Sequence, residues 1–317
     1  MHTLPRAFTP QPVRRILSRN GFFPYCGNSP VRCTDSTARL NLATGVTMSF
    51  SIETISPYTG SGFKCALFDF DGTISLIREG WQKVMIPYFC EVIEALGTDE
   101  NTDEVKAEVT EFVDRLTGKQ TIYQCIALDE AVVKRGGAHV EPGEYKAEYL
   151  RRLNLKIADR KNGLADGRIN PDSLSVRGAK AFIEALRAAG IKCFLASGTD
   201  ESDVIYEASL LGVKDLFDGG IHGARDALLD CSKEAVIKNM IEKQKLIPEE
   251  LVTFGDGFVE IELTAALGGY AVGVATDEKT GDGVDAAKRT RLINAGADMI
   301  IPHFEKYGDV IKALTVG

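Results

Sequence analysis

Short apolar runs of strand length alternate with longer helical segments along much of the chain. The first run, Phe63–Phe70, is almost continuously apolar and ends in acidic residues and a glycine, which favours a buried parallel strand over a helix. Four later runs repeat the pattern: Ile191–Ala196, Leu251–Phe254, Tyr270–Val274 and Met299–Ile301. We therefore expect at least five buried strands.

Helices are expected between these later strands. The segments Gly178–Ala189 and Ser202–Leu211 are each followed by a glycine, and a third begins with Ser232 as its cap and runs to about Lys245, ahead of Pro248. Strands that alternate with helices form right-handed βαβ units. The pattern predicts an α/β fold with a Rossmann-like parallel sheet.

The stretch 78–171 breaks this alternation. Its pattern predicts four or five helices and no strand, and four of the helices can be given bounds: Trp81–Leu96, Thr102–Leu116, Gln120–Lys134 and Gly143–Ala158. About ninety helical residues are too many for one crossover, so we expect an inserted α-helical cap subdomain over the carboxyl end of the first strand, where α/β proteins bind ligands. Residues 63–77 and 172–317 would then form the core.

Composition narrows the class of protein without naming a function. The chain has 317 residues, of which 44% are hydrophobic and 26% charged, and this is ordinary for a globular protein that buries a full core. No apolar stretch approaches the roughly 20 residues that a membrane helix needs. The seven scattered cysteines form no CxxC pair and indicate reduced thiols packed as small apolar groups.

The first 47 residues differ from the rest. They contain six arginines and a single acid, Asp35, and are rich in Ser and Thr. This composition is typical of an organelle transit peptide, which would place the protein in a mitochondrion or plastid. Alternatively Met48 is the true start, and a cytoplasmic location is the default. We expect residues 1–62 to be a disordered or targeting extension; the acidic remainder argues against nucleic-acid binding.

One motif carries chemistry. Asp69 and Asp71 directly follow the first predicted strand, and Gly72 and Thr73 come next. Two acids are poor choices for a buried strand, but at its carboxyl end both can reach a shared site as the chain turns at the glycine. Thr73 adds a hydroxyl and a backbone N–H group, both able to bind an anion.

This DFDGT sequence resembles the first motif of the haloacid dehalogenase (HAD) superfamily, and the later motifs follow in order. Ser197-Gly198-Thr199 ends a predicted strand, Lys233 starts a helix, and Gly255–Glu260 fits the fourth motif, GDxxxD, with Glu260 in place of the last Asp. The resemblance covers roughly residues 63–315. A large helical insertion after the first motif is similar to the branch that includes phosphoglycolate phosphatase and β-phosphoglucomutase.

The resemblance implies phosphoryl transfer with Mg²⁺ as cofactor. Asp69 would attack phosphorus and form an aspartyl-phosphate, and Asp71 would protonate the leaving oxygen and then deprotonate water. Mg²⁺ is a hard cation that prefers oxygen ligands; these would be the Asp69 side chain, the Asp71 carbonyl and Asp256. Glu260 would ligate directly, act through water, or only orient Asp256.

Phosphate contacts would come from the second and third motifs. Ser197 and the N–H groups of Gly198 and Thr199 precede a helix, whose N-terminus favours anions; the alternative is a helix cap and nothing more. Lys233 would pair with the phosphate and with Asp69. The alternatives are that Lys233 is an ordinary solvated lysine or that Lys238 takes its place.

Residues of the insertion are candidates for substrate contact. Arg78 would meet an anionic group on the substrate or lie at the surface. Lys119 and Gln120 belong to a polar turn between two helices, and in the family such loops descend onto the site and help to select the substrate. Trp81 is expected in the packed core of the insertion.

Taken together, these features predict a Mg²⁺-dependent phosphomonoesterase that acts on a small phosphorylated metabolite, a sugar phosphate or a phosphoglycolate-like molecule. One rival is a phosphomutase of the β-phosphoglucomutase kind, which returns the phosphoryl group to a sugar. Another is a non-catalytic binding protein on the same fold. We expect no nucleic-acid or membrane partner, and the sequence leaves the oligomeric state open.

Overall fold

A computed structural model describes residues 51–225 and 233–315. All of them belong to one unit of the chain, Thr47–Gly317. The predicted targeting segment 1–47, the alternative start Met48 and the predicted helix cap Ser232 lie outside the described residues. No helix in the described part of the chain is long and apolar enough to cross a membrane.

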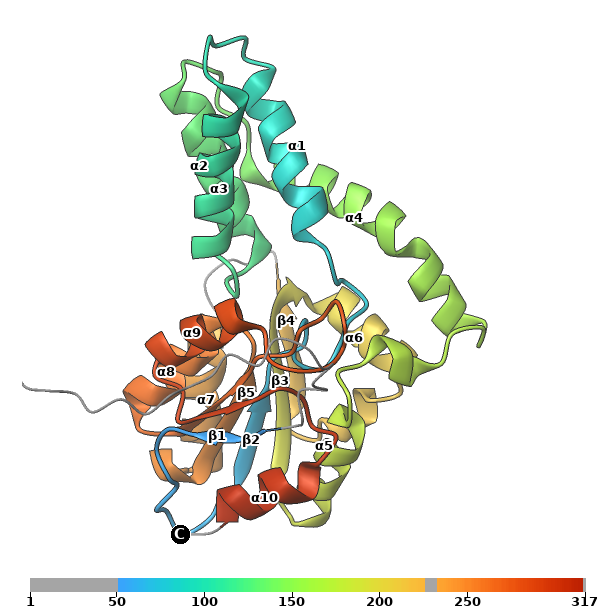
Figure 1. Cartoon of the computed structure of the whole chain (residues 1–317), viewed down its shortest axis with the longest axis vertical. Helices are drawn as coiled ribbons and strands as arrows, with labels where there is room; N and C mark the ends of the chain where they lie inside the picture. The colour runs from blue at the N-terminus through green and yellow to red at the C-terminus, as the bar shows by residue number, and fades with distance from the viewer. Residues whose placement is uncertain (1–50, 226–232, 316–317) are drawn as a thin grey trace, which may run out of the picture. The chain divides into compact units, whose positions relative to one another are not determined.

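The described strands form one sheet in the order β1-β7-β6-β5-β2-β3-β4 (Figure 1). All neighbouring pairs are parallel except β1 with β7. The strand bounds are β1 Glu53–Thr54, β2 Cys65–Phe68, β3 Lys192–Asp200, β4 Gly220–Ala224, β5 Leu251–Gly255, β6 Tyr270–Val274 and β7 Met299–Ile301. The five strands expected from the apolar runs are therefore present, and the predicted Rossmann-like α/β fold is confirmed.

Each face of the sheet carries its own layer of helices. The period-2 alternation of β2 places Phe68 toward the layer of α5, α6 and α10, and Leu67 toward the layer that includes α7. Phe68 stacks on Phe254 of β5, with ring centroids 4.8 Å apart, and Phe182 of α5 meets both rings. The helix bounds are α5 Ala179–Ala188, α6 Glu201–Leu210, α7 Lys233–Gln244, α8 Phe258–Leu267, α9 Ala286–Asn294 and α10 Tyr307–Thr315.

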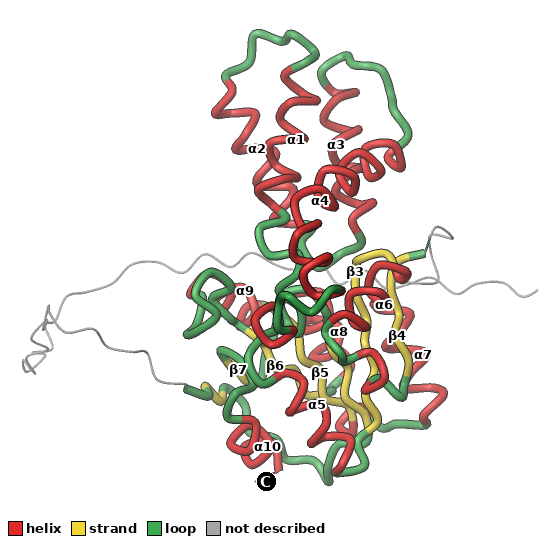
Figure 2. Tube along the Cα trace, turned by 90° about the vertical axis from the view of Figure 1, so that its right-hand side faces the viewer, coloured by secondary structure: helices red, strands yellow, loops and turns green. Residues whose placement is uncertain are grey.

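Between β2 and β3 the chain forms four helices and no strand across residues 78–171, all of which the structure describes. They are α1 Gln82–Glu94, α2 Thr102–Arg115, α3 Thr121–Lys134 and α4 Pro142–Ala165. Figure 2 shows them grouped together apart from the strands. We call α1–α4 the helical insertion.

The last helix of the insertion, α4, is longer than the helix that the sequence predicted. The expected helix ended at Ala158, but α4 continues to Ala165. Arg160 lies in the added turns, and its guanidinium donates to the carbonyl oxygens of Ile77 and Glu79 at 2.8 and 3.0 Å. These long-range hydrogen bonds link the two ends of the insertion, and no local pattern reveals them.

The amino-terminal boundary of the fold needs correction. Residues 1–62 were expected to be a disordered or targeting extension, but β1 lies within that range and pairs with β7. Tyr58 is buried, packs against Phe63 and Tyr270, and donates a hydrogen bond to the carbonyl of Glu249 at 3.0 Å. A two-residue edge strand has too little periodicity to be recognised in sequence.

Candidate active site

The carboxyl ends of β2, β3 and β5 bring the predicted motifs to one edge of the sheet. Asp69 and Asp71 follow β2, Ser197–Thr199 end β3, and Asp256 follows β5. Side chains from all three positions line a single pocket. The convergence expected from motif order and strand position is therefore present in the structure.

Lys233 forms the electrostatic centre of this edge. Its ammonium group lies 2.7 Å from Asp69 Oδ1 and 2.7 Å from Glu260 Oε2, and all three residues are buried. Although burial disfavours the ammonium, the two carboxylates raise the pKa of Lys233 above its ordinary value. Lys238, the alternative, lies on the exposed face of α7 and pairs with Glu234.

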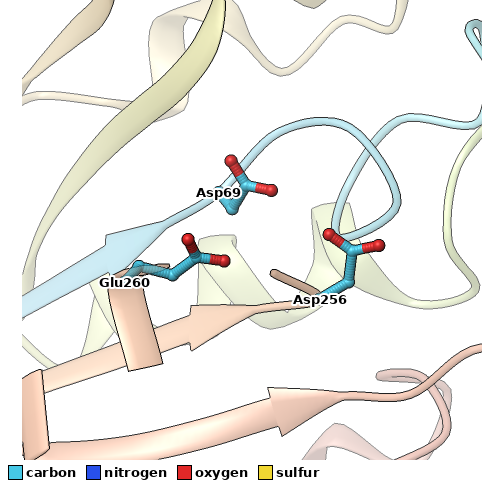
Figure 3. A group of neighbouring side chains, drawn as sticks. All are labelled: Asp69, Asp256 and Glu260. Carbon is cyan, nitrogen blue, oxygen red and sulfur yellow. The ribbon is translucent and has the colours of Figure 1, made fainter. Parts of the chain in front are cut away.

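Three carboxyl groups, from Asp69, Asp256 and Glu260, gather beside this lysine. Each offers an oxygen, and these oxygens lie within 4.8 Å of one another (Figure 3). Burial holds the pKa of Asp69 well above its ordinary value; Lys233 opposes this effect, and the charges of Glu260 and Asp256 add to it. Hard oxygen donors crowded around one point suit a divalent cation such as Mg²⁺.

The contacts of Glu260 help to choose among the roles that the sequence left open for it. One oxygen accepts a hydrogen bond from the Gly257 N–H group at 3.0 Å, which caps the first turn of α8, and the other accepts from Lys233. Both oxygens are thus already engaged within the protein. This arrangement favours an indirect role for Glu260 over direct ligation. Its contacts position Lys233 and the turn that carries Asp256.

Asp71 points to a different set of partners. Its Oδ2 accepts a hydrogen bond from the Thr199 hydroxyl at 2.8 Å, and its Oδ1 is buried 4.0 Å from the Arg78 guanidinium without a hydrogen bond. Burial raises the pKa of Asp71 to about 6; Glu207 adds to this, while Arg78 and Thr199 oppose it. The group is therefore suited to carry a proton near neutral pH.

Arg78 does not lie at the surface, which was one of its two expected positions. It is buried rather than at the surface, and its guanidinium is bound by Glu207 at 2.8 and 3.0 Å and by Asp203 at 2.8 Å. Glu207 is fully buried in α6. The guanidinium lines the pocket but already donates its hydrogen bonds to these two acids. Its contacts therefore stabilise the structure beside Asp71.

Thr73 also has a different set of contacts from those expected. Its side chain is fully buried, its hydroxyl oxygen accepts the Asp256 N–H group at 2.9 Å, and its own N–H group donates to Phe70. It is not among the residues that line the pocket. The motif threonine therefore fixes the turn that carries Asp256 instead of presenting its hydroxyl and N–H group to an anion.

Ser197 and Thr199 are buried, and the Thr199 N–H group donates to the Ser197 hydroxyl at 3.1 Å. The N-cap of α6 is Asp200, so the alternative reading of Ser197–Thr199 as a helix cap does not match the structure. Gly198 lies against the insertion, where an added Cβ would meet the Lys119 carbonyl oxygen at 2.6 Å. A glycine is needed there because the loop approaches the backbone so closely.

The loop between α2 and α3 forms one wall of the pocket. Lys119 is exposed and lines it, whereas Gln120 is buried and lines a second cavity with residues of α3 and α4. Trp81 packs against the hydrophobic core and also lines the pocket. The predicted turn thus reaches the site, with Lys119 facing it.

Several pocket residues were not found from the sequence. Glu278 lines the pocket and pairs with Lys288, which lies 2.7 Å from Asp256 Oδ2. Both residues follow the fourth motif at positions that carry no recognisable signal. Six further residues line the pocket, and the sequence marks them only as parts of a helix, a turn or a hinge. They are Ser75, Glu79, Thr117, Thr121, Gln124 and Tyr149.

Comparisons with known proteins bear on the fold and on the family. A search of curated proteins finds no significant match. Among solved structures, β-phosphoglucomutase from Clostridium difficile is 15% identical and aligns over 80% of this chain and 97% of its own, with a TM-score of 0.54. A predicted phosphoglycolate phosphatase from Haemophilus somnus is 16% identical over 80% of this chain and all of its own, with a TM-score of 0.53.

A third structure, a phosphonoacetaldehyde hydrolase-like protein from Oleispira antarctica, is 14% identical over 83% of this chain and 95% of its own, with a TM-score of 0.52. At these identities the likeness shows the fold alone. The family model of haloacid dehalogenase-like hydrolases matches residues 63–268, which is more than half of the chain. The chain therefore belongs to the haloacid dehalogenase-like hydrolases.

Proposed function

We propose that the chain is a Mg²⁺-dependent phosphomonoesterase that hydrolyses a small phosphorylated metabolite through an aspartyl-phosphate. One observation carries the proposal: Asp69 is held 2.7 Å from Lys233, two residues before an acid whose pKa is raised to about 6. A nucleophile and a proton donor thus share one pocket.

The reaction takes two steps. In the first, the Asp69 carboxylate attacks phosphorus, the bond from phosphorus to the ester oxygen breaks, and Asp71 gives its proton to the departing alkoxide. In the second, Asp71 takes a proton from water as that water attacks phosphorus, and the bond to Asp69 breaks. The products are an alcohol and inorganic phosphate, and both acids return to their initial states.

The other pocket residues supply binding and charge. The ammonium of Lys233, the Ser197 hydroxyl and the Gly198 N–H group would hold phosphoryl oxygens and stabilise the charge of the transition state. Asp69 and Asp256, with the Asp71 carbonyl, would hold Mg²⁺. When bound, Mg²⁺ neutralises phosphate charge, so that an anionic nucleophile can approach. The helical insertion, acting as a cap, would exclude water from the site.

The test is hydrolysis of p-nitrophenyl phosphate with Mg²⁺ by the wild-type protein and by Asp69→Asn. The amide is nearly isosteric but a poor nucleophile, so we expect a loss of at least about 10³-fold. Asp166→Asn is a matched control, because Asp166 is an exposed acid that pairs with Arg168. Retained activity in Asp69→Asn would refute the mechanism.

Product analysis decides between hydrolysis and the mutase alternative. Both reactions share the aspartyl-phosphate, but a mutase returns the phosphoryl group to a sugar hydroxyl. We expect free phosphate to accumulate when the protein is incubated with sugar 1-phosphates and Mg²⁺. Isomerised sugar phosphate without free phosphate would instead identify a phosphomutase.

A further inference from the structure

Helix α9 holds Asp256 from outside the pocket. The ammonium group of Lys288 lies 2.7 Å from Asp256 Oδ2, and Arg291, one helical turn further along, donates to the Asp256 carbonyl oxygen at 3.2 Å. On its other side the Asp256 N–H group donates to the Thr73 hydroxyl. The backbone of Asp256 is therefore fixed by two contacts that do not involve Lys288.

Lys288 has a second acidic partner. Its ammonium also pairs with Glu278, whose side chain lines the active-site pocket. The side chains of Lys288, Asp256 and Glu278 are only 14%, 16% and 22% exposed, so solvent screens their charges weakly. Lys288 and Glu278 thus add one positive and one negative charge at the edge of the acidic cluster formed by Asp69, Asp256 and Glu260.

We propose that Lys288 is a built-in counter-ion that weakens the binding of a divalent cation at Asp256, and that Glu278 opposes it. Together the two residues set the Mg²⁺ concentration at which the site fills. This inference rests on the proposed metal site but concerns residues outside the four sequence motifs.

The sign of each effect follows from Coulomb's law. A positive charge bound to a ligand carboxylate repels an incoming cation and reduces the electron density that the carboxylate offers, and Glu278 does the reverse. Loss of Lys288 would also remove a positioning contact, which by itself would weaken binding. Because Thr73 and Arg291 still hold the backbone of Asp256, we expect the charge effect to exceed the positioning effect.

The experiment is calorimetric titration of Mg²⁺ into the metal-stripped full chain. Lys288→Met removes the charge and keeps most of the side-chain length, and it is expected to lower the dissociation constant about tenfold. Glu278→Gln is expected to raise the dissociation constant about tenfold. The double variant should return to within roughly threefold of the wild-type value, since the two charges offset each other.

The chain offers a matched control pair. Lys238 and Glu234 form an ion pair at 2.6 Å, but their side chains are 63% and 52% exposed. Lys238→Met and Glu234→Gln change net charge by the same amounts and should leave Mg²⁺ affinity within about twofold, because solvent screens exposed charges. Far-UV circular dichroism establishes folding, and Glu278→Gln alone carries the test if Lys288→Met does not fold.

The outcomes separate this inference from the function on which it rests. Weaker or unchanged Mg²⁺ binding in Lys288→Met, or tighter or unchanged binding in Glu278→Gln, overturns the counter-ion role and leaves the proposed phosphatase activity intact. Absence of Mg²⁺ binding by the wild-type protein overturns both. A lower Mg²⁺ dissociation constant in Lys288→Met and a higher one in Glu278→Gln, with no such change in the two control variants, support the counter-ion role.

Discussion

At the scale of single residues, the two acids of the first motif differ because their surroundings differ. Asp69 lies against a lysine, whereas Asp71 is held by a threonine hydroxyl and lies near an arginine that is already bound by other acids. Burial raises the pKa of both, but only Asp69 has a cation in direct contact. In the proposed mechanism, these surroundings suit Asp69 to the role of nucleophile and Asp71 to that of proton donor.

Removal of the proton donor should matter more when the leaving group is poor. Asp71→Asn is expected to slow hydrolysis of an alkyl phosphate by about 10²–10⁴-fold. The loss with p-nitrophenyl phosphate should be much smaller in the first step, because its leaving oxygen needs no proton. Single-turnover rates on the two substrates provide the measurement, and equal losses would contradict the assignment.

The raised pKa of Asp71 also sets a pH dependence. Because the folded-state pKa of about 6 lies above the ordinary value, the acid stays protonated to a higher pH, and its proton is lost as pH rises through about 6. The first step on an alkyl phosphate should slow over that window. The same profile measured with Asp71→Asn should be flat there.

Arg78 should contribute to stability rather than to substrate binding. Arg78→Met would leave the fully buried Glu207 without its bidentate partner, at a cost of about 3–5 kcal/mol in the free energy of unfolding. Urea unfolding measures this cost. The double variant Arg78→Met/Glu207→Leu should recover part of the cost, because the buried carboxylate that lost its bidentate partner is then removed as well.

An exposed pair provides the comparison for Arg78. Arg151 bonds Glu148 on the surface of α4 with a side chain that is 60% exposed, so Arg151→Met is expected to cost less than about 1 kcal/mol. Equal costs at Arg78 and Arg151 would show that the buried network contributes no more than a surface ion pair.

At the scale of elements, the amino-terminal edge of the fold can be tested by truncation. A chain that begins at Ser51 keeps β1 and the buried ring of Tyr58, whereas one that begins at Phe63 exposes Tyr270 and the edge of β7. We expect the shorter chain to be less stable by about 3 kcal/mol, mainly through lost apolar burial. Thermal unfolding of the two chains decides, and identical midpoints would mean that β1 is dispensable.

The elements also show which parts of the fold can be predicted from the sequence. The motifs after β2, β3 and β5 could be placed because parallel strands end at one edge, and each motif follows a clear apolar run. By contrast, β4 is a glycine-containing edge strand that begins and ends without an apolar run. Its sequence, GIHGA, gives neither a continuous nor an alternating hydrophobic signal.

The residues of the candidate site likewise divide into those that the sequence predicts and those that only the structure reveals. Residues that act through their own strand or motif, such as Asp69 and Asp256, were predictable. Arg78 and Lys288 take their roles from partners far along the chain, in α6 and in the turn after β5. Such long-range pairs leave no trace in local composition, so a structure was needed to find them.

At the scale of the whole molecule, we expect one acidic cluster to link the stability of the fold to a divalent cation. Asp69, Asp256 and Glu260 crowd within 4.8 Å, and only part of their mutual repulsion is relieved by the neighbouring lysines. Mg²⁺ should therefore bind the folded chain in preference to the unfolded one. By mass action, a concentration 100 times the dissociation constant adds about 2.7 kcal/mol to the free energy of unfolding.

This linkage predicts a thermal shift. The midpoint of unfolding should rise by about 5–10 °C at that Mg²⁺ concentration, and excess EDTA should reverse the rise. Asp256→Asn should remove most of the shift, because it deletes a ligand charge, while the exposed Asp166→Asn should keep it. A shift of the same size in Asp256→Asn would place the cation elsewhere on the molecule, since a site built on this carboxylate cannot bind equally well without it.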